Sequence, residues 1–137
     1  QAAAAERDGA GQSFSDSADF MKKVNDVEVQ LLAMEATELR ILGALAAGQN
    51  LGPESSILKT RGTELQQAVT ELALEISGNY AAPLDQSTPA PGDNFQPIGP
   101  KAHNGVTQEY FNTRKVSIYA GSNEIQRNIM SKLVLGL

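Results

Sequence analysis

Two long stretches with helical spacing constrain the fold of this chain more than any other feature. In residues 18–48, and again in residues 53–78, apolar side chains recur in steps of three, four or seven. A period near 3.6 residues places such side chains on one face of an α-helix, so each stretch predicts a long helix with one apolar stripe. The stripes comprise Phe20, Val24, Val27, Leu31, Met34, Ile41 and Leu45 in the first stretch, and Leu58, Leu65, Ala68, Val69, Leu72 and Ile76 in the second.

The segment between these stretches predicts how the two helices pair. Gly48 and Gly52 end the first helix, and Pro53 can open the next one at its first turn. Long helices joined by so short a turn are expected to pack antiparallel. Gly62 lies within the second stretch, where it weakens the helix by about 1 kcal/mol relative to alanine. We expect Gly62 to permit a close approach of the two helices.

The remaining segments flank this pair. Residues 1–17 are predicted to be the end of an upstream helix, finishing near Gly9, and a polar linker in which Ser15 or Ser17 caps the next helix. The chain has no initiator methionine, so we expect a fragment of a longer polypeptide. The domain proper is predicted to span 18–137. Residues 81–105 form a loop within it, because their prolines and glycines preclude a regular helix or central strand, and a short helix is expected over 106–113.

Composition favours an all-α fold and excludes several classes of function. The 137 residues are 41% hydrophobic but only 5% aromatic, which suits packed helices better than a β-sandwich. A net charge of −5 without a basic stripe argues against nucleic acid and anionic lipid as partners. No apolar run reaches the roughly 20 residues that span a bilayer, and no signal peptide is present, so a cytoplasmic protein is expected. With no cysteine, and with His103 predicted to be a solvated loop residue, no metal site is expected.

The last nineteen residues carry the strongest functional pattern. Gly121 belongs to a small, flexible tripeptide that runs directly into an amphipathic helix, and Ser122 is a good N-cap for it. Ile125, Ile129 and Leu133 are expected to pack on one face while Gln126, Arg127 and Lys132 remain in water. One interpretation is an ordinary C-terminal docking helix. The other is a helix start whose free N–H groups face a ligand.

The full string around this helix start resembles the C-terminal signature of acyl-CoA dehydrogenases. That signature reads Tyr-x-Gly-Ser/Thr-x-Glu-Ile-Gln-Arg-x-Ile and closes on Val-Leu-Gly-Leu, and residues 119–129 and 134–137 match it. By helical layout the resemblance also covers residues 18–80, whereas the proline-rich middle matches poorly. The resemblance implies an all-α, up-and-down helical bundle, the last of the three parts of such an enzyme.

The resemblance also implies roles for individual residues. At the position of Gly121 the family's backbone approaches the acyl-CoA substrate, and the residues matching Ser122, Asn123 and Glu124 contact the FAD cofactor. Many members place the catalytic glutamate just before this glycine, where the present chain has Ala120, which cannot take a proton. Other members supply that base from the first helix of the domain, so we expect it upstream of this chain and expect this chain alone to be inactive. For Ser122 a purely structural cap is the alternative.

Two functions remain open at this stage. The first is oxidation of acyl-CoA to trans-2-enoyl-CoA in a larger FAD-dependent enzyme that passes electrons to an electron-transfer flavoprotein. The second is a non-catalytic assembly subunit of a mixed acyl-CoA dehydrogenase tetramer, which Ala120 would suit. Either implies a homo- or hetero-oligomer, a dimer or tetramer. Apolar residues beyond one stripe are compatible with such burial: Val29, Leu32, Leu42 and Leu74.

A second, weaker match lies at residues 75–78. Relatives often have Gln-x-x-Gly-Gly there, with the glutamine reaching the FAD of a neighbouring subunit, but this chain has Glu75 and a single Gly78. Glu75 is either such a contact or an exposed helical carboxylate. A helical bundle unrelated to the family, sharing the C-terminal string by chance, is the third possibility. In that case the two long helices should not pack antiparallel, and the helix that starts at Ser122 should not return beside them.

Overall fold

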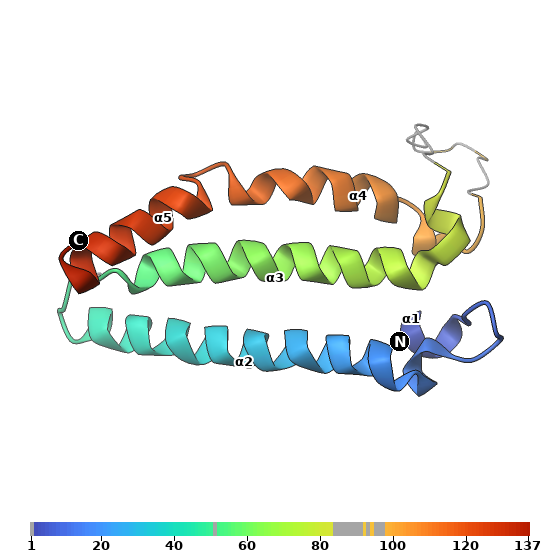
Figure 1. The fold of residues 1–137 in the computed structure, drawn as a ribbon, viewed down its shortest axis with the longest axis horizontal. Coiled ribbons are helices and arrows are strands. Elements are labelled where there is room, and N and C mark those ends of the chain that lie inside the picture. The colour runs from blue at the N-terminus through green and yellow to red at the C-terminus, as the bar shows by residue number, and fades with distance from the viewer. Residues whose placement is uncertain (1, 51, 84–91, 93, 95–97) are drawn as a thin grey trace. The chain divides into compact units, whose positions relative to one another are not determined.

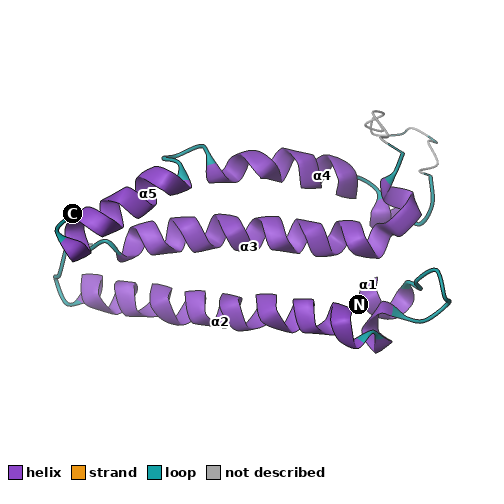
Figure 2. Ribbon diagram, viewed as in Figure 1, coloured by secondary structure: helices purple, strands orange, loops and turns teal. Residues whose placement is uncertain are grey.

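The computed structural model describes residues 2–50, 52–83, 92, 94 and 98–137. Within these residues it contains α-helices α1 (Ala2–Ala5), α2 (Ala18–Ala46), α3 (Glu54–Ser77), α4 (Val106–Thr113) and α5 (Asn123–Met130). A π-helical turn, Ser131–Leu135, continues α5. The only pairing of extended backbone among the described residues is an isolated bridge between Arg7 and Ser13, and no strand is drawn (Figure 2). The predicted all-α fold is confirmed.

The chain divides into two compact units, which helices α2 and α3 both enter. The first unit comprises Gln1–Val24 and Val69–Thr113, and the second comprises Asn25–Ala68 and Arg114–Leu137. Within each unit the segment of α2 runs antiparallel to the segment of α3 (Figure 1), as the short turn predicted. In the first unit Lys23 Nζ lies 2.8 Å from Glu75 Oε1. Glu75 is therefore an exposed helical carboxylate paired with Lys23, which agrees with one of the two interpretations of this residue from the sequence.

Local hydrogen bonds explain where the helices begin. Ser17 Oγ accepts from the backbone N–H of Phe20 at 3.3 Å, so Ser17 caps α2, one of the two predicted caps. Ser13 caps the preceding 3₁₀ turn, Phe14–Asp16, by accepting from the N–H of Ser15. Helix α4 covers 106–113, as predicted.

Each unit has a small apolar core. In the first unit Phe20 is 2% exposed and meets Phe14 edge to face, with ring centroids 5.2 Å apart. In the second unit Leu65 and Val116 are buried. Part of the predicted stripe nevertheless stays open to solvent, with Leu31 43% and Val69 47% exposed. The pairing of α2 with α3 thus covers the stripes only partly.

Helix α3 has a second, polar face that the search for apolar periodicity missed. In the second unit this face carries Gln67, whose Nε2 donates to the carbonyl of Arg114 at 3.2 Å, while Arg114 Nη2 donates to the carbonyl of Gln67 at 3.0 Å. Its buried members are Ser56 and Thr60 in the second unit and Thr70 and Ser77 in the first. Hydrogen bonds therefore join the segment after α4 to α3 in the second unit, beside the buried Leu65 and Val116.

The expected solvated position of His103 was wrong. The residue is 6% exposed, and its ring stacks on Tyr80 with centroids 5.5 Å apart. Nδ1 lies 2.9 Å from Ser77 Oγ, and Nε2 lies 3.0 Å from Glu6 Oε1. Since Ser77 donates its one hydroxyl proton to the carbonyl of Ala73, it accepts from Nδ1–H of the ring. The 3₁₀ turn Lys101–His103 carries the ring against the end of α3, which sequence spacing could not indicate.

Much of the predicted loop at 81–105 lies outside the described residues, namely 84–91, 93 and 95–97. The described flanks are 3₁₀ turns, Gly78–Ala81 and Lys101–His103. Thr107 Oγ1 donates to the carbonyl of Ala81 at 2.7 Å, which ties the two ends of the segment together.

Gly62 does not mark a tight contact. A Cβ built on it would lie 3.6 Å from Met34 Sδ, an ordinary van der Waals distance, so the expected close approach of the helices is not what requires glycine there. We predict that Gly62→Ala raises the free energy of unfolding by about 1 kcal/mol, through helix propensity. Urea denaturation measures the change. Gly43→Ala in α2, where a Cβ meets nothing within 4 Å, is the matched control. A loss of stability at position 62 with a gain at position 43 would contradict this prediction.

Candidate functional site

The segment between α4 and α5 makes a sharp turn at the predicted site. A 3₁₀ turn, Arg114–Ser117, ends with the N–H groups of Ile118 and Tyr119 both donating to the carbonyl of Lys115. Ala120 and Gly121 then adopt left-handed backbone angles, with φ of 55° and 83°. Ala120 is the only non-glycine among the described residues with a positive φ. Alanine in this region costs about 1–2 kcal/mol, and strained residues of this kind cluster at functional sites.

Ser122 caps α5, as predicted. Its Oγ accepts from the backbone N–H of Ile125 at 3.4 Å. The pKa of Glu124, in the first helical turn, is lowered by a hydrogen bond from its own backbone N–H, then by the hydroxyl of Ser122 and the charges of Arg127 and Lys59. A carboxylate stabilised in its ionised form is a weaker proton acceptor, so Glu124 is poorly suited to be a general base.

Asn123 has its side chain turned into the protein. It is 4% exposed, and its Oδ1 accepts from Lys59 Nζ at 2.8 Å and from Thr63 Oγ1 at 3.1 Å. Both donors belong to α3. The side-chain oxygen of Asn123 therefore anchors α5 on α3, and the residue as a whole is buried. Its predicted contact with FAD stays a prediction.

These anchors set the rotation of α5, and the expected packing of its apolar face was wrong for this chain. Arg127 Nη2 contacts Glu64 Oε1 at 2.6 Å, which fixes the same side of the helix as Asn123. Gln126, expected in water, is half-buried. Ile125 and Leu133 are instead 53% and 66% exposed, and Ile129 is 37% exposed. The helix presents polar atoms to α3 and its apolar face to the outside.

The turn itself is open. Ala120 and Gly121 are exposed, and Tyr119 is 53% exposed. Within the part of the chain that the structure describes, the N–H groups of Ala120 and Gly121 have no hydrogen-bond partner. The positive φ of Gly121 favours glycine, whereas a Cβ there would meet only Gln126 Nε2, at 2.6 Å, which is the movable end of a flexible side chain. The turn can thus offer main-chain donors to a ligand at close range.

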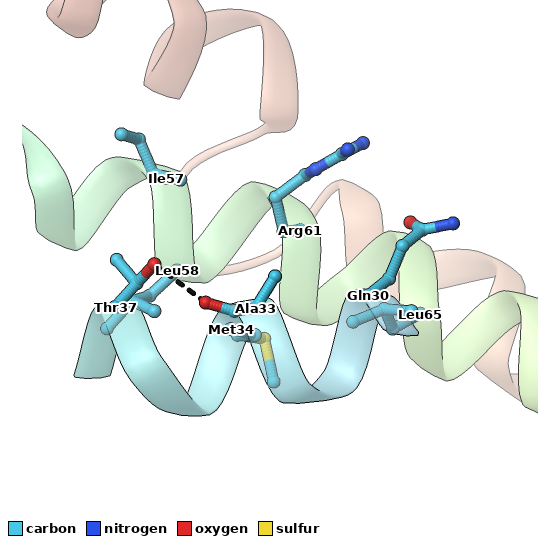
Figure 3. Close-up of a pocket in the computed structure, with 8 residues that line it drawn as sticks. All are labelled: Gln30, Ala33, Met34, Thr37, Ile57, Leu58, Arg61 and Leu65. Carbon is cyan, nitrogen blue, oxygen red and sulfur yellow. Dashed lines mark hydrogen bonds between the residues drawn. The ribbon is translucent and has the colours of Figure 1, made fainter. Parts of the chain in front are cut away.

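The hollows of the second unit lie elsewhere. A pocket of about 140 Å³ opens between α2 and α3, where Thr37 Oγ1 donates to the carbonyl of Ala33 (Figure 3). A wider hollow of about 590 Å³ lies at the end of α2 and the start of α3, beside Arg40, Gln49 and Glu54. Neither is lined by residues 119–124. The first is smaller than the roughly 300–1,000 Å³ of ordinary ligand pockets. The Ala120–Gly121 turn is therefore an open surface of this chain. A ligand bound there would be enclosed only by further polypeptide outside this chain.

One buried hydroxyl near the turn is unsatisfied. Thr60 is 4% exposed, and its Oγ1 has no hydrogen-bond partner among the described residues. We predict that Thr60→Val, which keeps the shape and removes the hydroxyl, raises the free energy of unfolding by about 1 kcal/mol. Thr63→Val is the matched contrast, because Thr63 Oγ1 reaches both the carbonyl of Thr60 and Asn123 Oδ1. It should lower stability by about the same amount. Equal losses in urea denaturation would show that Thr60 has a partner after all.

Two further classes of site receive no support from the described residues. They contain no group of three His, Cys, Asp or Glu side chains placed to hold a metal ion. Among the same residues, no helix combines the length and the apolar character needed to cross a membrane.

The chain matches a family of known proteins over nearly its whole length. The family model for the acyl-CoA dehydrogenase C-terminal domain matches residues 1–135, a range that also includes residues 1–17 and the proline-rich loop. No curated protein and no solved structure gives a match. The predicted resemblance is confirmed, and the chain belongs to the acyl-CoA dehydrogenase C-terminal domain family.

Proposed function

We propose that this chain is the C-terminal helical domain of an FAD-dependent enzyme that oxidises acyl-CoA to trans-2-enoyl-CoA. One observation carries the proposal most directly. The exposed Ala120–Gly121 turn presents unpartnered N–H groups ahead of the capped helix α5, in a chain of this family. The N-terminus of a helix favours anionic and phosphate-bearing ligands, and left-handed glycine lets a ligand reach the main chain.

The residues of the turn fit such a cofactor in part. The backbone of Gly121 and Ser122 is well placed to donate, and Glu124 is exposed beside it. The side chains of Ser122 and Asn123 are engaged within the protein, the first with the N–H of Ile125 and the second with Lys59. We therefore infer that Ser122 meets FAD through its main chain, that the buried Asn123 supports this contact from within the protein, and that Gly121 faces the thioester of the substrate.

The division of labour in the reaction follows from the same residues. Bound FAD supplies the hydride acceptor. The turn orients the thioester by main-chain hydrogen bonds, which are strongest where water is excluded. No residue of the turn is suited to remove the α-proton, because Ala120 has no ionisable group and Glu124 is held ionised by its hydrogen bonds. We infer that a glutamate elsewhere in the full-length polypeptide is the base, and that an electron-transfer flavoprotein takes the electrons.

The test uses the full-length polypeptide that carries this chain. Purified protein is expected to contain FAD, to be bleached anaerobically by an acyl-CoA, and to form the enoyl-CoA. Gly121→Ala is expected to lower kcat/KM at least about tenfold, since a misplaced contact in an active site commonly has such an effect. Gly105→Ala is the matched control, because Gly105 has a φ of 80° in the first unit and a Cβ there meets nothing within 4 Å. Equal effects of both substitutions would attribute the loss to backbone strain alone.

A non-catalytic assembly subunit is the second candidate. It is favoured by Ala120 at the family's base position and by apolar residues on the outer side of α2 in the second unit. These residues are Val29, Leu32, Leu39 and Leu42, all more than half exposed. Contiguous exposed apolar residues mark interaction surfaces. Three results together would favour this candidate over the enzyme. The full-length protein would contain no glutamate upstream of this chain that could serve as the base, it would form a dimer or tetramer in light scattering, and acyl-CoA would not bleach it.

A further inference from the structure

Lys59 of α3 reaches both ends of the turn at once. Its Nζ donates to the carbonyl of Ser117, before the turn, at 3.5 Å, and to Asn123 Oδ1, after the turn, at 2.8 Å. The five residues between these two anchors include the left-handed pair Ala120 and Gly121. One side chain on a long helix thus holds the entry and the exit of the segment proposed to face the ligands.

The second donor to Asn123 cannot replace this contact. Thr63 has a single hydroxyl proton, and its Oγ1 lies within reach of two acceptors, the carbonyl of Thr60 at 2.9 Å and Asn123 Oδ1 at 3.1 Å. Lys59 has three protons and a full charge, and hydrogen bonds from charged donors are about twice as strong as neutral ones. Both oxygens that accept hydrogen bonds from Lys59 are uncharged, and no carboxylate among the described residues forms an ion pair with it. Its charge therefore acts on the turn and on the start of α5, where it also helps to lower the pKa of Glu124.

We propose that Lys59 is a positioning residue for the reaction, fixing the Ala120–Gly121 main chain in its left-handed conformation through Ser117 and Asn123. This deepens the proposed function and rests on it. The strained conformation of Ala120 needs support from its surroundings, because an isolated alanine avoids positive φ. Without the lysine, the turn loses the side chain that, among the described residues, holds both of its ends, and its N–H groups no longer stand where a ligand meets them.

The experiment compares variants of the full-length protein loaded with FAD. Lys59→Met removes the charge and keeps the length of the side chain, and Lys59→Arg restores a cationic donor. In Lys59→Met we expect the dissociation constant for FAD to rise about tenfold, with a changed visible circular dichroism of the flavin. We also expect kcat to fall more than KM rises. Lys59→Arg should recover most of the flavin signal. Lys101→Met, an exposed lysine of the first unit, is the matched control and should leave all readouts unchanged.

A second measurement does not depend on bound FAD. Hydrogen exchange of the apo protein should show the hydrogen-bonded amides that flank the turn, those of Tyr119 and Ile125, exchanging about tenfold faster in Lys59→Met, and the hydrogen-bonded amide of Glu109 in the first unit unchanged. If Lys59→Met does not fold, Thr63→Val is measured in the same way and is expected to shift exchange in the same direction. Unchanged exchange at the turn together with an unchanged flavin spectrum would overturn the proposal. Gly121→Ala separates the two failures: if it also leaves flavin and activity intact, the proposed site itself is wrong, whereas an effect of Gly121→Ala alone removes only the role of Lys59.

Discussion

Phe20→Ala is expected to lower the free energy of unfolding by about 3–5 kcal/mol, the usual result of deleting a buried aromatic ring. Phe20 is among the largest fully buried side chains of the described residues, and it makes the edge-to-face contact with Phe14. In a unit with so few buried apolar side chains, the surrounding chain has little material with which to refill the cavity. Native domains are more stable than their unfolded chains by only about 5–15 kcal/mol, so a loss of this size is a large part of the total.

The measurement is urea denaturation of the 137-residue chain followed by far-ultraviolet circular dichroism. Phe111→Ala is the matched control, because Phe111 lies in the same unit but is 64% exposed. It should change stability by no more than about 0.5 kcal/mol. Similar losses for both variants would mean that Phe111 is covered in solution, by a second copy or by another part of the full-length protein. A small loss for Phe20 would show that the first unit holds together by other contacts.

The long helices could be predicted from sequence because their signal is local. Spacing of apolar residues gave α2 and α3 to within a few residues, and the turn chemistry around Pro53 gave their antiparallel pairing. The cap at Ser122 was likewise readable, since an N-cap acts on backbone only three residues away. The short helix over Val106–Thr113 followed from the end of the proline-rich segment.

The packing of the C-terminal segment could not be predicted in the same way. Apolar periodicity assigned Ile125 and Ile129 to the interior, but burial of Asn123 and the pairing of Arg127 with Glu64 turn that face outward. These contacts join residues more than sixty positions apart. A polar stripe of serine and threonine on α3 looks like a solvated face until its partners are known. His103 was misjudged for the same reason, because its partners Glu6 and Ser77 are distant in sequence.

The outward apolar face of α5 and the exposed turn have one physical explanation in common. Polar anchoring to α3 fixes α5 without using its apolar residues, which leaves Ile125 and Leu133 for another surface. An apolar contact would hold α5 less specifically in rotation than a buried amide with two donors. We infer that precise placement of the turn, more than burial of area, is what the Asn123 contacts provide.

Asn123→Leu is therefore expected to be the second most damaging substitution, lowering the free energy of unfolding by about 3 kcal/mol. The estimate combines the loss of a hydrogen bond from a charged donor with that of a neutral one, Lys59 and Thr63 respectively. Leucine has a similar volume but no acceptor, so the Lys59 charge is left against an apolar group. Urea denaturation measures the loss. Asn128→Leu, on the exposed side of the same helix, should change stability by no more than about 0.5 kcal/mol.

Asn123→Asp distinguishes anchoring from mere packing. It keeps the acceptor oxygen and places a negative charge opposite Lys59 Nζ, and an acid in the first turn of a helix is favoured by the helix dipole. We expect it to retain most of the stability that Asn123→Leu loses. If Asp and Leu are equally damaging, the amide N–H₂ rather than the oxygen is what this position requires, and α5 is not held by Lys59 and Thr63. If neither is damaging, the helix is placed on α3 by the Arg127–Glu64 pair and the Ser122 cap alone.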